Sequence, residues 1–207
     1  MSVYDKAQAL LDKGPSRSTL YSVRIGGGKV DQKVNDYLDF FCYVTTIPGI
    51  SAQTVAAVGQ EHQGIYRETP GGILFSKPFT MQIIENSEYL TYYGIRKWFD
   101  EISDNANQTS RPGSTGRAIR MNYYNDIVSN IQLTKLEFPA DAKVTDRGED
   151  LNKYYKSPVK VNFINAYPVK IGEINLQSTS SDQPVIWQAD FTYESYFIDK
   201  GDGKKLV

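Results

Sequence analysis

The segment at residues 185–198 constrains the fold most, because its side chains alternate in the two-residue period of a β-strand. One face carries apolar residues, namely Val185, Trp187, Ala189, Phe191, Tyr193 and Phe197. The other face carries Gln188, Asp190, Thr192 and Glu194. Fully extended, the segment would span about 45 Å at ~3.3 Å per residue, whereas strands usually have roughly 5–6 residues. The pattern therefore predicts either a strongly bent strand or a strand in a sheet that several subunits share.

Further strand patterns fill most of the remaining chain and predict a mainly β fold of the α+β class, built as a sandwich or barrel-like structure. Residues 172–176 belong to this set, because Ile174 and Leu176 alternate with Glu173 and Asn175. A turn at Pro48-Gly49 separates two of the other predicted strands. These other strands cover Thr19–Ile25, Tyr37–Ile47, Ile50–Val58, Ile65–Ile73, Pro78–Ile84 and residues 159–163.

One long amphipathic helix is predicted at residues 87–102. Asn86 or Ser87 can cap it, Glu88 favours its first turn, and an apolar stripe runs from Leu90 to Ile102. A short helix is predicted in the arm 1–14, ending at Gly14-Pro15. Polar loops are predicted at 105–117 and 139–157. We interpret the chain as one domain, 1–207, because 207 residues supply a sizeable core.

The scarcest residues argue against catalysis and against a bound cofactor or metal. The chain has one histidine, His62 in a polar segment, and one cysteine, Cys42 in an apolar segment. Gly26-Gly27-Gly28-Lys29 lacks the Ser or Thr that a phosphate-binding loop needs after its lysine, which favours a turn or loop. The net charge of −1 argues against a dedicated nucleic-acid clamp.

Two patterns bear on membranes and secretion. No basic-then-apolar signal follows Met1. Residues 40–60 carry no charge, but the break at Pro48-Gly49 would leave backbone groups unsatisfied in lipid. We therefore expect two strands around a turn there and no membrane span.

The order of these elements resembles the tail tube proteins of contractile-tailed bacteriophages. The similarity covers most of the chain, and the segment Tyr167–Leu176 with the strand that follows it is its most specific part. The regions 26–39, 105–117 and 139–157 exceed a minimal tube protein, so no role is carried over to them. The other resembling segments are Leu20-Tyr21-Ser22-Val23, Cys42–Gly49 with the following strand, and Ile95–Asp100.

The resemblance implies a structural subunit and no enzyme. Six copies would form a ring, and stacked rings would form a hollow tube whose inner strands join into one β-barrel. The implied partners are further copies, a surrounding sheath, and baseplate and tail terminator proteins. DNA would pass through the lumen without sequence-specific binding. The implied location is the tail of a virion that is assembled in the host cytoplasm.

Two sets of residues are candidates for this assembly. Gln188, Asp190, Thr192 and Glu194 would face the lumen, where acidic groups would repel DNA phosphates; an ordinary solvent-facing side of a sandwich explains them equally well. A second set would form contacts between rings, although packing on the subunit's own core is the competing interpretation. This set comprises Val3, Leu10, Leu11, Ile47, Pro48, Gly49 and Ile50.

Two other functions remain open from the sequence. The first is the tube protein of a related contractile injection or type VI secretion apparatus, with protein rather than DNA as cargo. The second is a monomeric β-sandwich binding module, in which some of the 15 Tyr and 2 Trp side chains stack on sugars.

Overall fold

The computed structural model describes residues 16, 18–19, 21–56, 68–103, 121–137, 156–176 and 183–200. The elements in chain order are β1 (Tyr21–Ile25), α2 (Gln32–Phe41), β2 (Cys42–Thr45), β3 (Ile50–Ala56), β4 (Glu68–Phe75), β5 (Phe79–Ile84), α3 (Leu90–Asp100), α4 (Tyr124–Ile127), β6 (Ser129–Glu137), β7 (Lys156–Ile171), β8 (Ile186–Thr192) and β9 (Ser195–Lys200). None of the described helices is long and apolar enough to cross a membrane.

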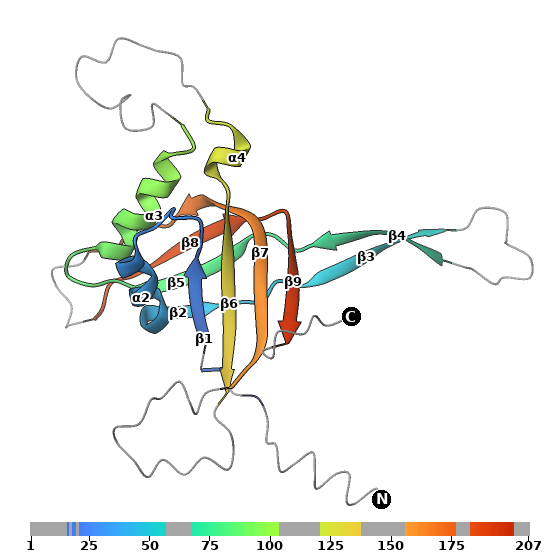
Figure 1. The fold of residues 1–207 in the computed structure, drawn as a ribbon, viewed down its shortest axis with the longest axis horizontal. Helices are drawn as coiled ribbons and strands as arrows, with labels where there is room; N and C mark the ends of the chain where they lie inside the picture. The colour runs from blue at the N-terminus through green and yellow to red at the C-terminus, as the bar shows by residue number, and fades with distance from the viewer. Residues whose placement is uncertain are drawn as a thin grey trace, which may run out of the picture.

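Seven strands form one antiparallel sheet in the order β1-β6-β7-β8-β5-β2, with β9 also paired to β7. The sheet bends at β7. Residues 156–166 of β7 belong with β1, β6 and β9 in a first half-sheet, and residues 167–171 belong with β8, β5 and β2 in a second half-sheet. Strands of the two halves run across one another (Figure 1). The prediction of a mainly β, barrel-like fold is therefore confirmed.

The predicted long strand at 185–198 is present as β8 and β9, which pair with β7 in one nearly continuous register. Tyr167 lies opposite Thr192 and Ile164 lies opposite Ser195. The bend falls between them, where Asn165 has a φ of 52° and the Glu194 amide donates to the Ile164 carbonyl at 3.0 Å. Residues 185–198 thus form a strongly bent strand, which was the first of the two structures predicted for this segment.

The bend shifts the alternation by one residue, which makes the sequence prediction wrong for Phe197. Trp187, Ala189, Phe191 and Tyr193 are buried as predicted. Beyond the bend, however, Tyr196 is 8% exposed and faces the core, whereas Phe197 is 41% exposed. The period of two holds only while the pairing is regular, so no alternation pattern could carry across the bend.

The prediction of a strand at Tyr37–Ile47 is wrong for its first half, because residues 32–41 form the helix α2. Val34 and Leu38, one helical turn apart, are both buried. The apolar run Phe40-Phe41 suggested an early strand start, yet both side chains are exposed. The strand begins at Cys42, and its partner is β5, whereas β3 pairs with β4. The two strands around Pro48-Gly49 are therefore present but do not form a hairpin with each other.

The predicted amphipathic helix is α3, and its start depends on two side chains. The helix begins at Leu90 and its N-cap residue is Tyr89, so the prediction that Asn86 or Ser87 occupies the cap is wrong. Asn86 Oδ1 nevertheless accepts a hydrogen bond from the Leu90 amide at 3.0 Å. Glu85, which the sequence did not single out, is buried and accepts from the amides of Thr91 at 3.2 Å and Tyr92 at 3.0 Å. It also accepts from Trp187 Nε1 at 2.7 Å, so one carboxylate joins α3 to β8.

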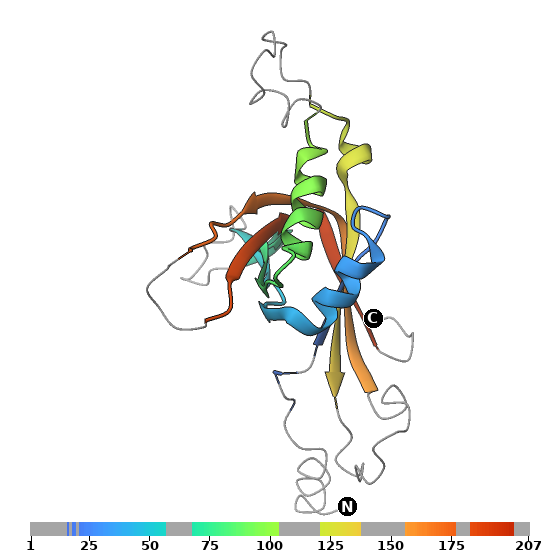
Figure 2. The same ribbon diagram turned by 90° about the vertical axis from the view of Figure 1, so that its left-hand side faces the viewer.

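The core lies between the two half-sheets, and α2 and α3 close its remaining side (Figure 2). Trp98 of α3 packs on Phe191 with ring centroids 5.7 Å apart. The two helices approach closely where a Cβ on Gly94 would lie 2.8 Å from Val34 Cγ2, so this position requires glycine.

Several predictions have a partial outcome or lie outside the described residues. Residues 26–30 form a loop before α2, as expected. The strand predicted at residues 172–176 is absent, because β7 ends at Ile171 and these residues pair with no other described strand. Within the predicted strand at 65–73, β4 is described from Glu68. The helix predicted in the arm 1–14, His62, the loop 105–117 and residues 139–155 lie outside the described residues.

Candidate assembly surfaces

Small-molecule chemistry finds little support in the described part of the chain. No group of three or more His, Cys, Asp and Glu side chains is placed there to hold a metal ion. Cys42 is buried, and burial raises the pKa of its thiol to about 12, so the thiol stays protonated near neutral pH. The candidate functional features of the fold lie on its surface, in strand edges, exposed apolar side chains and polar faces.

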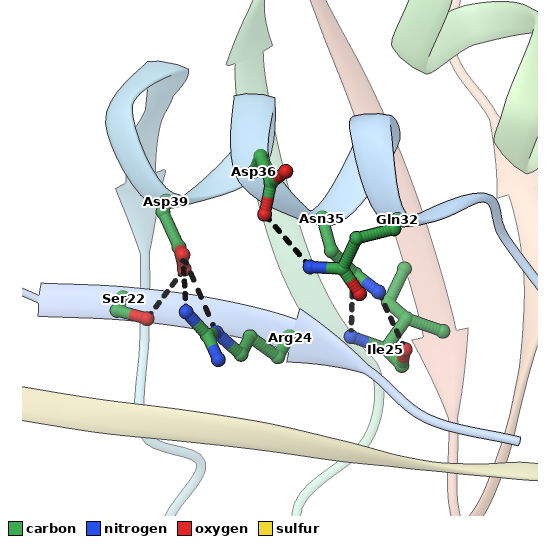
Figure 3. A network of polar contacts seen from close by, with 7 residues as sticks. All are labelled: Ser22, Arg24, Ile25, Gln32, Asn35, Asp36 and Asp39. Atoms are coloured by element: carbon green, nitrogen blue, oxygen red, sulfur yellow. Dashed lines mark hydrogen bonds and ion pairs between the residues drawn. The ribbon is translucent and has the colours of Figure 1, made fainter.

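The edge of β1 is covered by α2 (Figure 3). Asn35 Oδ1 accepts from the Ile25 amide at 2.8 Å, and its Nδ2 donates to the Ile25 carbonyl at 3.0 Å, so the side chain acts as a strand partner. Next to it, Asp39 accepts from Ser22 Oγ at 2.5 Å and pairs with Arg24 at 3.0 Å. The hydrogen bond to Asp39, together with the attraction of its negative charge, raises the pKa of Arg24. The helix thus blocks this edge against pairing with another chain.

Both edges of the second half-sheet, by contrast, lack a strand partner among the described residues. β2 pairs with β5 on one side only. At the other edge, β7 keeps β6 as a neighbour only as far as Ala166, which lies opposite Ser129. Beyond it, residues 167–171 pair with β8 alone. A sheet with two unpaired edges exposes backbone donors and acceptors that another chain can bind.

Strands β3 and β4 form a two-stranded arm that projects from the body of the molecule (Figure 1). Both strands are exposed along almost their whole length, and Ile73 is 68% exposed. The root of the arm is nevertheless fixed. Tyr196 Oη donates to the Pro48 carbonyl at 2.5 Å, Tyr193 Oη donates to the Ser76 carbonyl, and the ring of Phe75 lies 5.3 Å from that of Tyr196.

The exposed apolar side chains are concentrated along one stretch of chain, residues 40–56, which carries no charge. This stretch runs from the end of α2 through the unpaired strand β2 into β3. Its position beside an unpaired edge makes it a candidate interface. Seven large apolar residues are exposed there, namely Phe40, Phe41, Tyr43, Val44, Ile47, Ile50 and Val55.

The lumen candidates lie on or next to the face of β8 that points away from the core. Gln188 and Thr192 are partly exposed on that face. Asp190 is only 7% exposed and accepts from Thr80 Oγ1 at 2.9 Å and Gln188 Nε2 at 2.8 Å. Glu194 is exposed at the bend and accepts from Asn165 Nδ2 at 2.6 Å. Of the two carboxylates, that of Asp190 is therefore buried and already has two hydrogen-bond donors within the subunit.

The ring-contact candidates that the structure describes lie at the root of the arm. Ile47, Gly49 and Ile50 are exposed, whereas Pro48 is buried and its carbonyl accepts the Tyr196 hydrogen bond. Val3, Leu10 and Leu11 lie outside the described residues.

Sequence reasoning missed the roles of two residues that build these surfaces, namely the hydrogen bonds of Asn35 to β1 and of Tyr196 to the root of the arm. Asn35 has no local signature, since its role depends on β1 lying beside α2. Tyr196 could have been found only by locating the bend that moves it to the core face.

Comparisons with known proteins agree on one family. A family model described as "Phage tail tube protein" matches residues 16–199. No curated protein matches the chain. The solved anti-feeding prophage baseplate contains a chain that is 10% identical, with a TM-score of 0.54 over 90% of this chain and 97% of that one. A chain of an extracellular contractile injection system, in the sheath–tube complex of PVC, is 11% identical, with a TM-score of 0.53 over 97% and 99%.

A third similar chain comes from the sheath/tube terminator of the same type of system. It is 13% identical, with a TM-score of 0.51 over 89% of this chain and 96% of that one. At these identities the structural matches establish a shared fold, and the family model establishes membership.

Proposed function

The chain belongs to the phage tail tube protein family, and we propose that it is the repeating subunit of a hollow tube made of stacked hexameric rings. The family is structural, so the surfaces that matter are those that join copies. The proposal covers the ring, the stacking of rings and the material that passes through.

The observation that carries this proposal is the second half-sheet, which has an unpaired edge on each side. An open sheet with two free edges invites uncontrolled pairing, and closure into a barrel removes both edges at once. Head-to-tail contacts repeated by rotation close into a ring of identical copies. In the first half-sheet the edge of β1 is covered by α2, whereas β9, the edge strand on the opposite side, pairs with β7 alone among the described residues.

In such a ring, the polar face of β8 would line the bore. Gln188 and Thr192 then present an amide and a hydroxyl group to the lumen, and Glu194 adds a carboxylate at the bend. Asp190 presents little of its carboxylate to the bore, because it is 7% exposed and both Thr80 and Gln188 donate to it. Lys170 lies opposite Asp190 in the pairing of β7 with β8, so the two opposite charges would offset each other on this wall. A polar wall without a net positive charge would let a polyanion such as DNA pass without being retained.

The arm would connect one ring to the next. In Figure 1 the arm continues beyond the second half-sheet in roughly the direction of its strands, and barrel strands run partly along the barrel axis. An arm in this direction reaches toward a neighbouring ring. We propose that Ile47, Gly49, Ile50 and the exposed residues of β3 and β4 make this contact, together with Val3, Leu10 and Leu11.

Partners and cargo follow from the family and its relatives. Similar chains occur in a sheath–tube complex, a sheath/tube terminator and a six-fold symmetrised baseplate. We therefore propose sheath, terminator and baseplate proteins as partners, within a phage-like tail assembled in the host cytoplasm, and DNA as cargo. The second candidate is an injection system that delivers protein, because two of these relatives belong to systems of that name.

Electron microscopy of the purified full-length protein tests the proposal. Rings or tubes with a central hole are expected. A protein that stays monomeric at high concentration, both alone and with isolated baseplate, would favour the monomeric binding module instead. Removal of residues 1–13 should leave the fold intact and reduce stacking; normal tubes from this truncation would exclude Val3, Leu10 and Leu11 from the contact.

A further inference from the structure

Two charged side chains share the face of the second half-sheet that the proposed ring turns toward the bore. Asp190 of β8 lies on this face, because its neighbours Ala189 and Phe191 are fully buried in the core. Lys170 of β7 lies opposite Asp190 in the antiparallel pairing, and residues that lie opposite one another share a face. Among the other described residues that the pairings of β2, β5, β7 and β8 place on this face, none is charged.

The hydrogen bonds of Asp190 occupy only one of its two carboxylate oxygens. Thr80 Oγ1 at 2.9 Å and Gln188 Nε2 at 2.8 Å both donate to Oδ1. Oδ2 has no hydrogen-bond donor among the described residues. In that part of the chain every fully buried side-chain nitrogen or oxygen has a hydrogen-bond partner, so Oδ2 must keep contact with water.

These hydrogen bonds do not require an acid at position 190. The amide oxygen of an asparagine there could accept from Thr80 and Gln188 in the same way. The aspartate adds a negative charge at a site that is only 7% exposed, where a carboxylate is costly to desolvate. Its charge therefore needs a role other than hydrogen bonding, and Lys170 across the strand pair supplies one.

Lys170 is the exposed member of the pair. Its ammonium group has neither an ion pair nor a hydrogen bond within the described residues. The Cα atoms of residues that face each other across antiparallel strands lie about 4.5–5.5 Å apart, and the Debye length at physiological salt is roughly 8 Å. The attraction between the two charges is therefore only partly screened. Lys170 can reach into the bore while Asp190 lowers the positive potential around it.

We propose that Lys170 is the side chain of the bore wall that contacts the phosphates of a nucleic acid cargo, and that Asp190 is the counter-charge that keeps this contact from retaining the cargo. This inference rests on the proposed tube function and adds to it the two residues that control passage. Glu194 does not replace Asp190 in this role, because it lies at the bend beyond β8 and accepts from Asn165 Nδ2 at 2.6 Å.

Repetition along a tube makes the counter-charge necessary. Every copy in a ring would present one Lys170 side chain to the bore, and every further ring would repeat the set. A cation that binds a phosphate releases a counterion, so the contacts add up along a nucleic acid and give a strongly salt-dependent affinity. Many weak contacts to one polymer hold it far more tightly than any single contact. With Asp190 beside each Lys170, the pair adds no net charge to the wall, and each phosphate contact remains exchangeable.

Retention of DNA by assembled tubes tests the charge pair. Tubes of the full-length protein are formed with a fluorescein-labelled oligothymidylate and sedimented, and the bound DNA is measured over a range of salt concentrations. Asp190→Asn keeps the Oδ1 acceptor and removes the charge. Its tubes should bind the oligonucleotide at least about tenfold more tightly than the parent tubes at low salt, and the difference should vanish at high salt. Asp190→Asn tubes that bind no more DNA than the parent tubes would overturn the proposal.

Two further variants assign the effect to Lys170. In the double variant Lys170→Gln/Asp190→Asn the added binding should disappear, because the wall has lost its cation; added binding that persists would contradict the role of Lys170. Asp36→Asn is the matched control, since it removes one negative charge from the exposed side of α2, outside the second half-sheet. Its tubes should bind like the parent tubes, and an increase equal to that of Asp190→Asn would show that net charge alone is responsible.

Electron microscopy of the same samples separates the two proposals. Tubes whose DNA binding is unchanged by Asp190→Asn would refute the charge pair and leave the tube function standing. A parent protein that forms no tubes under any assembly condition would overturn both.

A second variant covers the case in which Asp190→Asn does not assemble. Lys170 is exposed, so Lys170→Gln should form normal tubes. These tubes should lose at least about two-thirds of the weak binding that the parent tubes show at low salt. Unchanged binding in Lys170→Gln would overturn the assignment of the phosphate contact to this residue.

Discussion

Tyr196 Oη donates a hydrogen bond of 2.5 Å to the Pro48 carbonyl, which ties the strand β9 to the root of the arm 148 residues earlier in the chain. The bond forms because the bend after Tyr193 turns Tyr196 toward the core. The core of the subunit therefore helps to set the position of an arm whose described strands pair only with each other. An arm that must reach an adjacent ring needs such a fixed root.

Replacing Tyr196 with phenylalanine removes this hydrogen bond and keeps the ring contacts. We expect the free energy of unfolding to fall by about 1 kcal/mol, measured by urea denaturation, and tubes to become shorter in electron micrographs. Tyr123→Phe is the control, because Tyr123 is exposed. Equal stability of the two variants would contradict the role given to Tyr196.

Replacing Asn35 with alanine should destabilise the subunit by about 2 kcal/mol, because the Ile25 amide and carbonyl lose their partner at a buried site. The β1 edge would also be uncovered, so the variant should aggregate more readily in light scattering. Asp36→Asn, on the exposed side of the same helix, should change stability by less than about 0.5 kcal/mol. Aggregation equal to that of the parent protein would contradict the idea that α2 guards the edge.

Replacing Glu85 with glutamine should cost at least about 2 kcal/mol in urea unfolding. The carboxylate accepts from three backbone amides, those of Asn86, Thr91 and Tyr92, and also from Thr91 Oγ1 and Trp187 Nε1. An amide group cannot accept at both ends. The exposed Glu88→Gln is the matched control in the same turn. A Glu85→Gln protein as stable as this control would show that the buried carboxylate is dispensable.

The arm should tolerate charge in the isolated subunit but not between rings. Ile73→Asp places a carboxylate on an exposed strand, so thermal unfolding should shift little while stacking is lost. Electron microscopy should show single rings in place of tubes. Tyr93→Asp, at a similarly exposed site on α3, should still give tubes. Tubes of normal length from Ile73→Asp would rule out the arm as the ring contact.

Stability should decline at alkaline pH. Burial raises the pKa of Tyr193 from its ordinary value of 10 to about 12, with the neighbouring Tyr196 contributing, and burial raises that of Cys42 from 9 to about 12. In both cases the unfolded chain loses its proton first, so the stabilisation is complete below the ordinary pKa and is lost as the pH rises toward 12. The midpoint of urea unfolding should begin to fall near pH 9. In Cys42→Ser the fall should begin about one unit later, and an unchanged onset would contradict this assignment.

Long-range pairing explains which features could be predicted from the sequence. Alternation in β5, β7 and β8 and the apolar stripe of α3 are local patterns, and each produced the expected element. The whole of α2 was missed, because its buried positions, Val34 and Leu38, are few and its last turn ends in the apolar pair Phe40-Phe41. The side of the chain on which Tyr196 lies depends on a bend created by pairing with β7, which no local pattern encodes.

The same reasoning applies to the candidate surfaces. The exposure of most side chains in residues 40–56 could hardly be predicted from the sequence. These residues carry no charge, and uncharged segments are more often buried. The burial of Asp190 follows from Thr80 and Gln188 lying beside it in the sheet. The unpaired segment 172–176 is informative because sequence and subunit disagree there: the alternation favours a strand, and the subunit alone supplies no partner.

A three-dimensional reconstruction of the assembled protein by electron cryo-microscopy tests the central claim most directly. We predict a closed ring of copies in which β7, β8, β5 and β2 form the inner wall, with Gln188 and Thr192 facing the bore and the arms reaching the next ring. A reconstruction that places this half-sheet on the outer surface, or an assembly without a bore, would contradict the account.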